Sequence, residues 1–168
     1  MAMTATAMAN SIKSSINQVN NPSNAIALFY SALCDYVEAN AEVFYSWVAV
    51  QPGTPPTPDP LTVIKAKILC NGNLTLSGAT DPSAACSIFS NSLNTAAATW
   101  IIKFPTGFAL SPCFVIPTVS ISPSGATDMD TAWSIVCAQI IMGIKTATPA
   151  MTGSHGPYVG SGTFTSII

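Results

Sequence analysis

The sequence predicts a single α+β domain in which three or four helices pack with a few short, mostly antiparallel strands. In several stretches apolar residues recur every three or four positions, which is typical of helices, while other stretches alternate with a period of two. These helical and strand patterns follow one another irregularly, and no βαβ unit with a phosphate-binding fingerprint is present. The chain has 168 residues, enough for one core of ordinary size and too few for a second full domain.

The first fifty residues are expected to be an arm followed by helices. Residues 1–9 have no periodic apolar face and predict an extended N-terminal arm. Residues 10–50 predict a helical region. Its first helix carries Ile12, Ile16 and Val19 on one face, and its second runs over 24–46, with Ser23 or Asn24 as its cap.

Residues 51–60 contain five of the 13 prolines and predict a stiff, polyproline-like connector between two regions. Aromatic grooves also bind segments of this kind, but a linker is the favoured interpretation. The α+β region expected over 61–168 opens with a half-buried strand, because Ile64, Ala66 and Ile68 alternate with two lysines before a turn at Asn71-Gly72.

The rest of the chain is predicted to hold two helices and two strands. Asp81 as cap and Pro82 at the first helical position begin a helix that continues to about Ile102. A helix capped by Asp128 is apolar nearly all round and is therefore expected to be buried. The helix capped by Asp128 is expected to span 128–144. A strand is expected over 113–122, where Pro117 indicates an edge strand or a bulge, and a C-terminal strand over 162–168.

Charge is the most unusual property of the chain. Only 7% of the residues are charged, against about 25% in ordinary soluble domains, and all five basic residues are lysines. A net charge of −2 without arginine disfavours nucleic-acid binding. Ala, Thr and Ser together make up 60 residues, so the polar surface is expected to consist of small, uncharged side chains. Since interface cores are depleted in charged residues, this composition favours permanent assembly.

Membrane and secretory functions are disfavoured as well. The longest apolar run, Trp133 to Ile144, has 12 residues, whereas a spanning helix needs about 20. The first residues lack the basic and apolar parts of a signal peptide, so assembly in the cytoplasm is expected. Five widely and irregularly spaced cysteines predict reduced, buried thiols rather than disulfides or a zinc site; they are Cys34, Cys70, Cys86, Cys113 and Cys137.

No catalytic, cofactor or metal site is predicted. His155 is the only histidine, and a hydrolase would combine it with Ser154 and an acid such as Asp128 or Asp130. No Gly-x-Ser-x-Gly motif supports that alternative, helix capping explains both acids, and a loop histidine bonded to a carbonyl or to another subunit is the favoured interpretation.

Four glycines cluster near that histidine without the lysine of a phosphate-binding loop, so they are expected to shape a turn beside the last strand; they are Gly153, Gly156, Gly160 and Gly162.

Two segments resemble the small structural proteins of tailed-phage virions: Ala9-Asn10-Ser11-Ile12-Lys13-Ser14-Ser15-Ile16 and Ala32-Leu33-Cys34-Asp35-Tyr36-Val37. The resemblance covers the first 40 residues and implies a head or tail component assembled in the host cytoplasm.

Together with the composition, the resemblance predicts a non-enzymatic structural subunit whose partners are copies of itself and other virion proteins, with no small-molecule substrate. The arm Met1–Ala9 and the tail Thr146–Ile168 are expected to make the contacts by adding to a neighbour's sheet edge. The alternatives are a small secreted binding module, a pore-forming protein, or a hydrolase that uses Ser154 and His155.

Overall fold

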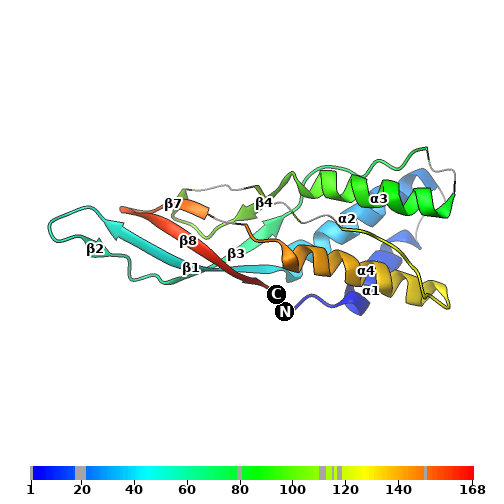
Figure 1. Cartoon of the computed structure of the whole chain (residues 1–168), viewed down its shortest axis with the longest axis horizontal. Coiled ribbons are helices and arrows are strands. Elements are labelled where there is room, and N and C mark those ends of the chain that lie inside the picture. Colours follow the sequence, from blue (N-terminus) through cyan, green and yellow to red (C-terminus); the bar gives the residue numbers. More distant parts are fainter. Residues whose placement is uncertain are drawn as a thin grey trace.

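The helices gather at one end of an elongated molecule and the sheet forms the other end (Figure 1). The computed structural model describes residues 2–17, 22–78, 81–109, 113–114, 116, 119–149 and 151–168. Within these residues it contains four helices and one antiparallel sheet around a single core. The predicted single-domain α+β class is therefore confirmed.

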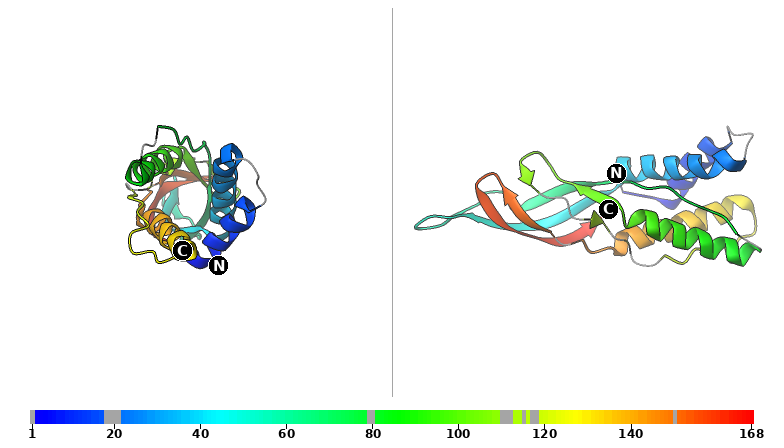
Figure 2. Two further views of the ribbon diagram at one scale, coloured as in Figure 1. Left: turned by 90° about the vertical axis from the view of Figure 1, so that its right-hand side faces the viewer. Right: turned by 90° about the horizontal axis from the view of Figure 1, so that it is seen from above.

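The helical end consists of α1 (Ala5–Ile16), α2 (Pro22–Asn40), α3 (Pro82–Ala97) and α4 (Met129–Thr146). Seen along the long axis, these helices are arranged in a ring (Figure 2, left). The predicted starts of two of them are confirmed. Asp81 caps α3 by accepting from the Ala84 N–H at 2.8 Å, and Asp128 caps α4 by accepting from the Thr131 N–H at 2.7 Å.

The sheet has the strand order β5-β7-β8-β1-β3-β4-β6, and every pairing among its described strands is antiparallel. The strands are β1 (Glu42–Gln51), β2 (Thr57–Pro58), β3 (Val63–Leu69), β4 (Trp100–Lys103), β5 (Phe108–Ala109), β6 (Cys113–Phe114), β7 (Met151–His155) and β8 (Tyr158–Ile167). The ten-residue β1 lies in the middle, pairs with β8 and β3, and at its end also pairs with β2.

Alternate side chains of β1 build the core of the sheet end. Val43, Tyr45, Trp47 and Ala49 are buried, whereas the residues between them point outward. Burial raises the pKa of Tyr45 to about 12, which keeps its hydroxyl protonated. The core continues without a break into the helical end, so the two ends form one folded unit.

The predicted N-terminal arm is wrong from residue 5 onward. Thr4 accepts a hydrogen bond from the Ala7 N–H and caps α1, which begins at Ala5. Met8 and Ile12, one turn apart, are fully buried. Residues 5–9 are therefore part of the helical core.

The predicted helical region 10–50 is wrong beyond residue 40. The second helix begins at Pro22, ahead of both proposed caps, Ser23 and Asn24, and ends at Asn40. Residues 42–51 form β1 because they are rich in β-branched and aromatic side chains that alternate between two faces. Val19 lies outside the described residues.

The predicted lengths of two later elements also differ from the structure. The helix expected to reach Ile102 ends at Ala97, because residues 100–103 form β4. The strand expected over 113–122 is described only at 113–114, the described residues 119–122 are not strand, and Pro117 lies outside the described residues. By contrast, the strand predicted after the connector is confirmed as β3, the helix expected over 128–144 as α4, and the C-terminal strand as part of β8.

The proline-rich segment 51–60 does not separate two regions. The strands on either side of it, β1 and β3, pair directly, so the segment folds back through β2 as the end of a long hairpin. This hairpin projects beyond the other strands (Figure 1 and Figure 2, right). Residues 51–58, here called the tip, are all exposed and uncharged.

The tail 146–168 is not a free contact segment. Its two strands pair with each other, and β8 also pairs with β1 from Val43 to Val50. The side of β8 that faces β1 is therefore already bonded within this chain, as is its other side from Tyr158 to Gly162.

Candidate functional site

The lone histidine lies beside a buried carboxylate. His155 Nδ1 is 2.8 Å from Asp59 Oδ2, and the side chain of Asp59 is only 1% exposed. Trp47 Nε1 donates to the same oxygen at 2.9 Å, and the Leu61 N–H donates to the other oxygen at 2.9 Å. The carboxylate therefore joins the base of the tip, β1 and the end of β7.

Hydrogen bonds keep this carboxylate ionised. Burial by itself would raise the pKa of Asp59, but the donors Leu61 N–H, His155 and Trp47 outweigh it and hold the pKa below its ordinary value. His155 also stacks on Phe108, with ring centroids 4.6 Å apart, and retains 31% of its side-chain exposure. The imidazole is thus fixed on two sides.

The hydrolase constellation is not assembled. Ser154 and His155 are consecutive residues of β7, so their side chains point to opposite faces of the sheet. Asp128 and Asp130 begin α4 at the far end of the molecule (Figure 1). The acid that meets His155 is Asp59, 96 residues away in sequence, so the ring nitrogen Nδ1 faces a carboxylate rather than the predicted backbone carbonyl.

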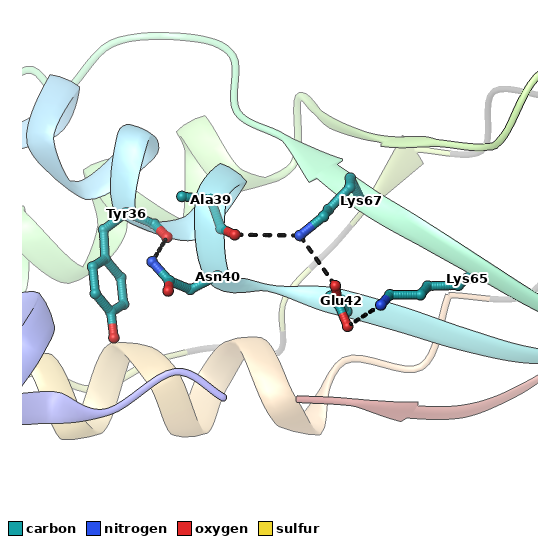
Figure 3. Close-up of polar contacts among 6 residues, drawn as sticks. All are labelled: Tyr36, Ala39, Asn40, Glu42, Lys65 and Lys67. Carbon is teal, nitrogen blue, oxygen red and sulfur yellow. Dashed lines mark hydrogen bonds and ion pairs between the residues drawn. The ribbon is translucent and has the colours of Figure 1, made fainter. Parts of the chain in front are cut away.

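The remaining charged pairs are structural. Glu42, at the start of β1, lies 2.8 Å from Lys65 Nζ and 3.5 Å from Lys67 Nζ, and Lys67 also donates to the Ala39 carbonyl at the end of α2 (Figure 3). A lysine at this position complements the negative end of the helix dipole. These contacts connect α2, β1 and β3 where the helical end meets the sheet.

Asp130 accounts for another pair. Its carboxylate lies 2.9 Å from Lys13 Nζ of α1, so this acid joins two helices in addition to standing in the first turn of α4.

Four of the five cysteines are described as free thiols. Cys34, Cys70, Cys86 and Cys137 are unpaired, as expected, but only Cys137 is buried, where burial raises its pKa to about 11. The side chain of Cys113 lies outside the described residues. Within the described ranges, no group of three or more His, Cys, Asp or Glu is placed to hold a metal ion.

The glycines near His155 fall into two groups. Gly156 has a φ of +56° in the turn between β7 and β8, as predicted, and Gly153 precedes it in β7. Gly160 and Gly162 instead lie inside β8, where the neighbouring strands approach closely. The prediction of a turn is therefore confirmed for Gly156 and wrong for Gly153, Gly160 and Gly162, which lie within strands.

The outward side of the sheet is uncharged toward the tip, from Ser46 and Val63 onward, whereas Glu42, Lys65 and Lys67 lie on the same side nearer the helical end. We call seven residues of this uncharged part the neutral face: Ser46, Val48, Val50, Val63, Val159, Ser161 and Thr163. Val50 pairs with Val159, Val48 with Ser161, and Ser46 with both Thr163 and Val63. Val48 is 71% exposed, and Val63 and Val159 are each 57% exposed. This surface could not be found from sequence because the strand that carries its centre was predicted to be a helix.

A cavity of about 410 Å³ opens among the four helices. Its walls come from the last turn of α1, the N-terminal halves of α2, α3 and α4, and the loops around Leu76 and Ile121. Three aromatic side chains pack against one another in it: Phe29 lies 5.2 Å from Phe89 and 5.8 Å from Trp133 between ring centroids. We call it the end cavity, because these helix termini form the end of the molecule opposite the tip (Figure 1).

None of the helices in the described parts of the chain is long and apolar enough to cross a membrane. No family model matches the sequence, and neither a curated protein nor a solved structure matches the chain.

Proposed function

We propose that this protein is a structural subunit of a large symmetric assembly, formed by copies of itself together with other proteins of the same particle. The observation that supports this role is the neutral face, where exposed valines are interleaved with serine and threonine. Single exposed apolar residues are ordinary, but a contiguous uncharged patch is typical of a protein interface.

The composition supports the same role. Twelve charged side chains, five basic and seven acidic, are spread over 8860 Å² of accessible surface. Several of them are already paired within the chain, as at Glu42 with Lys65 and Asp59 with His155. A surface with so few charged side chains is weakly protected against association. In the proposed assembly, neighbouring subunits bury this surface permanently.

The occupant we propose for the neutral face is the same face of a second copy. Two such faces bring no like charges together, and packing the two sheets leaves valine against valine, or against the small hydroxyl side chains between them. The proposed particle is a phage virion assembled in the host cytoplasm, in line with the resemblance of residues 9–16 and 32–37. The proposed role includes no catalysis and no cofactor.

The first prediction concerns this contact. Replacing Val48 and Val159 together by lysine puts two cations on the neutral face while leaving the buried side of β1 and β8 unchanged. We expect the wild-type protein to form a defined oligomer, and we expect the double variant to have a smaller mass, because the lateral contact is lost, with an unchanged circular dichroism spectrum. Mass is measured by light scattering after size exclusion.

The matched control adds the same two charges to exposed helix positions, Asn91→Lys with Ala138→Lys, and is expected to assemble like the wild type. Isolated particles are examined in parallel for the protein by mass spectrometry. A wild-type protein that remains monomeric at every concentration, and that is absent from particles, would refute the proposed function.

A further inference from the structure

The end cavity has an aromatic and aliphatic lining. Its twelve lining residues include no charged side chain, and among their side chains only the Trp133 indole and the Cys86 thiol can form hydrogen bonds. A cavity of about 410 Å³ falls within the size range of ordinary binding sites. Such sites usually carry a few polar groups that orient a ligand. Because such groups are nearly absent here, we expect an occupant that inserts apolar side chains.

The tip has the matching chemistry. Residues 51–58 read Gln-Pro-Gly-Thr-Pro-Pro-Thr-Pro, so half of them are proline and none is charged. Proline side chains are apolar and their backbone loses little conformational entropy on docking, which is why proline-rich segments bind to aromatic-lined grooves. The tip is also held firmly at its base, since Asp59 is bonded to β1 and to His155.

The position of the two features excludes a contact within one molecule. The tip and the helix termini that line the end cavity lie at opposite ends of the long axis (Figure 1 and Figure 2, right). We propose that the tip of one copy enters the end cavity of the next, so that copies of the chain join head to tail. This inference rests on the proposed function and adds a second, longitudinal contact to the lateral one at the neutral face.

Such a contact is heterologous, because it joins two different surfaces, and it therefore repeats until the row closes into a ring or continues as a filament. Neither surface carries an ion that burial would strip of water, so the contact avoids the main cost of buried charge. The same contact would bury the tip residues, which are all exposed in the single chain.

The test places a charge on each surface in turn. Ala85 lines the cavity and is exposed near the start of α3, where an acidic side chain is favourable for the helix. We expect Ala85→Glu and Thr54→Glu each to raise the concentration needed for half-assembly at least tenfold, as measured by sedimentation velocity. Ser83→Glu, which adds the same charge to the same turn outside the cavity, is the control and is expected to leave that concentration unchanged.

A synthetic peptide of residues 51–58 tests the contact directly. We expect it to bind the Val48→Lys, Val159→Lys variant at protein concentrations too low for head-to-tail association, and to change the fluorescence of Trp133, with the signal absent in a Trp133→Phe version and with binding weakened at least tenfold by Ala85→Glu. The apolar dye anilinonaphthalene sulfonate is titrated in parallel, and the peptide is expected to displace it.

The outcomes separate the two proposals. If the wild type assembles while both glutamate variants assemble equally well, the head-to-tail contact is refuted and the proposed function stands. If the wild type is a monomer throughout, the proposed function itself fails. Dye binding without peptide binding would mean that the cavity holds a small apolar molecule, which also refutes the contact.

Discussion

Asp59 makes four polar contacts within the sheet end. Its carboxylate accepts from the Leu61 N–H and from Trp47, and it lies beside His155, while its own N–H donates to the Ala49 carbonyl at 2.9 Å. Removing one partner of a buried polar group leaves the others unsatisfied, which costs more than the lost bond itself. We therefore assign this residue the role of fixing the tip to the sheet.

The pKa of Asp59 predicts how stability depends on pH. A carboxyl group whose pKa is lowered on folding stabilises the protein fully above its unfolded pKa, near 3.9, and this stabilisation is lost as the pH falls through the folded value. We expect Asp59→Asn to lower the thermal midpoint by several degrees at pH 7. The difference from wild type should narrow as the pH falls below about 4.

Thermal scans of both proteins between neutral and strongly acidic pH check this expectation. Glu42 and Asp128 also have lowered pKa values, the first chiefly through its hydrogen bond with Lys65 and the second chiefly through that with Thr131. Glu42 and Asp128 are present in both wild type and Asp59→Asn, so their contributions cancel when the two thermal midpoints are subtracted. A constant difference at every pH would contradict the assignment of an ionised Asp59.

At this scale the sequence reveals the histidine but not its partner. His155 stands out because it is unique, whereas Asp59 lies in a proline-rich stretch where an acid is unremarkable. The pair is separated by 96 residues and forms only because the base of the tip and the end of β7 meet across the sheet. No local pattern encodes such a meeting, while local caps such as Asp81 and Asp128 could be predicted.

At the scale of single elements, β8 provides a matched pair of sites. A methyl group added at Gly160 would run into the backbone of β1 at Val48 and Ala49, which cannot move without breaking the strand pairing. A methyl group added at Gly162 would meet the end of the Met151 side chain, at 2.6 Å from Cγ and 2.7 Å from Sδ, and a flexible methionine can move aside.

We therefore expect Gly160→Ala to cost about 3 kcal/mol or more in the free energy of unfolding, and Gly162→Ala only about 1 kcal/mol. Chemical denaturation with each variant measures both values. Equal costs at the two sites would show that the approach of β8 to β1 is not as close as described.

The strand β1 shows why one element escaped prediction. Val37, Ala41 and Phe44 continue the helical spacing of α2 into residues that are strand, so periodicity extended the helix across the boundary. The competing signal lies in composition, since Val43, Tyr45 and Trp47 prefer a strand and alternate with outward residues. The connector was misinterpreted for the same reason, because a hairpin cannot be recognised when one of its strands is missing.

At the scale of the whole molecule, the surfaces proposed for contact are uncharged, and this predicts an unusual response to salt. Ion pairs between subunits weaken as salt screens them, whereas apolar contacts do not. We expect the size of the assembly to be unchanged from about 0.05 to 1 M sodium chloride. Ammonium sulfate should enlarge it, because sulfate strengthens apolar burial.

Sedimentation at a series of salt concentrations provides the measurement. Dissociation by sodium chloride alone would show that the few charged side chains hold the subunits together. In that case the neutral face and the end cavity would lose their proposed importance. The low charge itself could be predicted from composition, but the two surfaces that it leaves bare could be located only once the strands and helix ends were in place.

The central pairing of β1 with β8 also dictates the order of events during synthesis. Eight of the described elements lie between these two strands in sequence, so β1 leaves the ribosome long before its main partner. The nascent chain thus exposes Val43, Tyr45 and Trp47 until β8 has been made. Contacts this distant in sequence form slowly, and unpaired apolar strands aggregate in the meantime. We therefore expect refolding of the purified chain to be slow, with aggregation that increases with protein concentration.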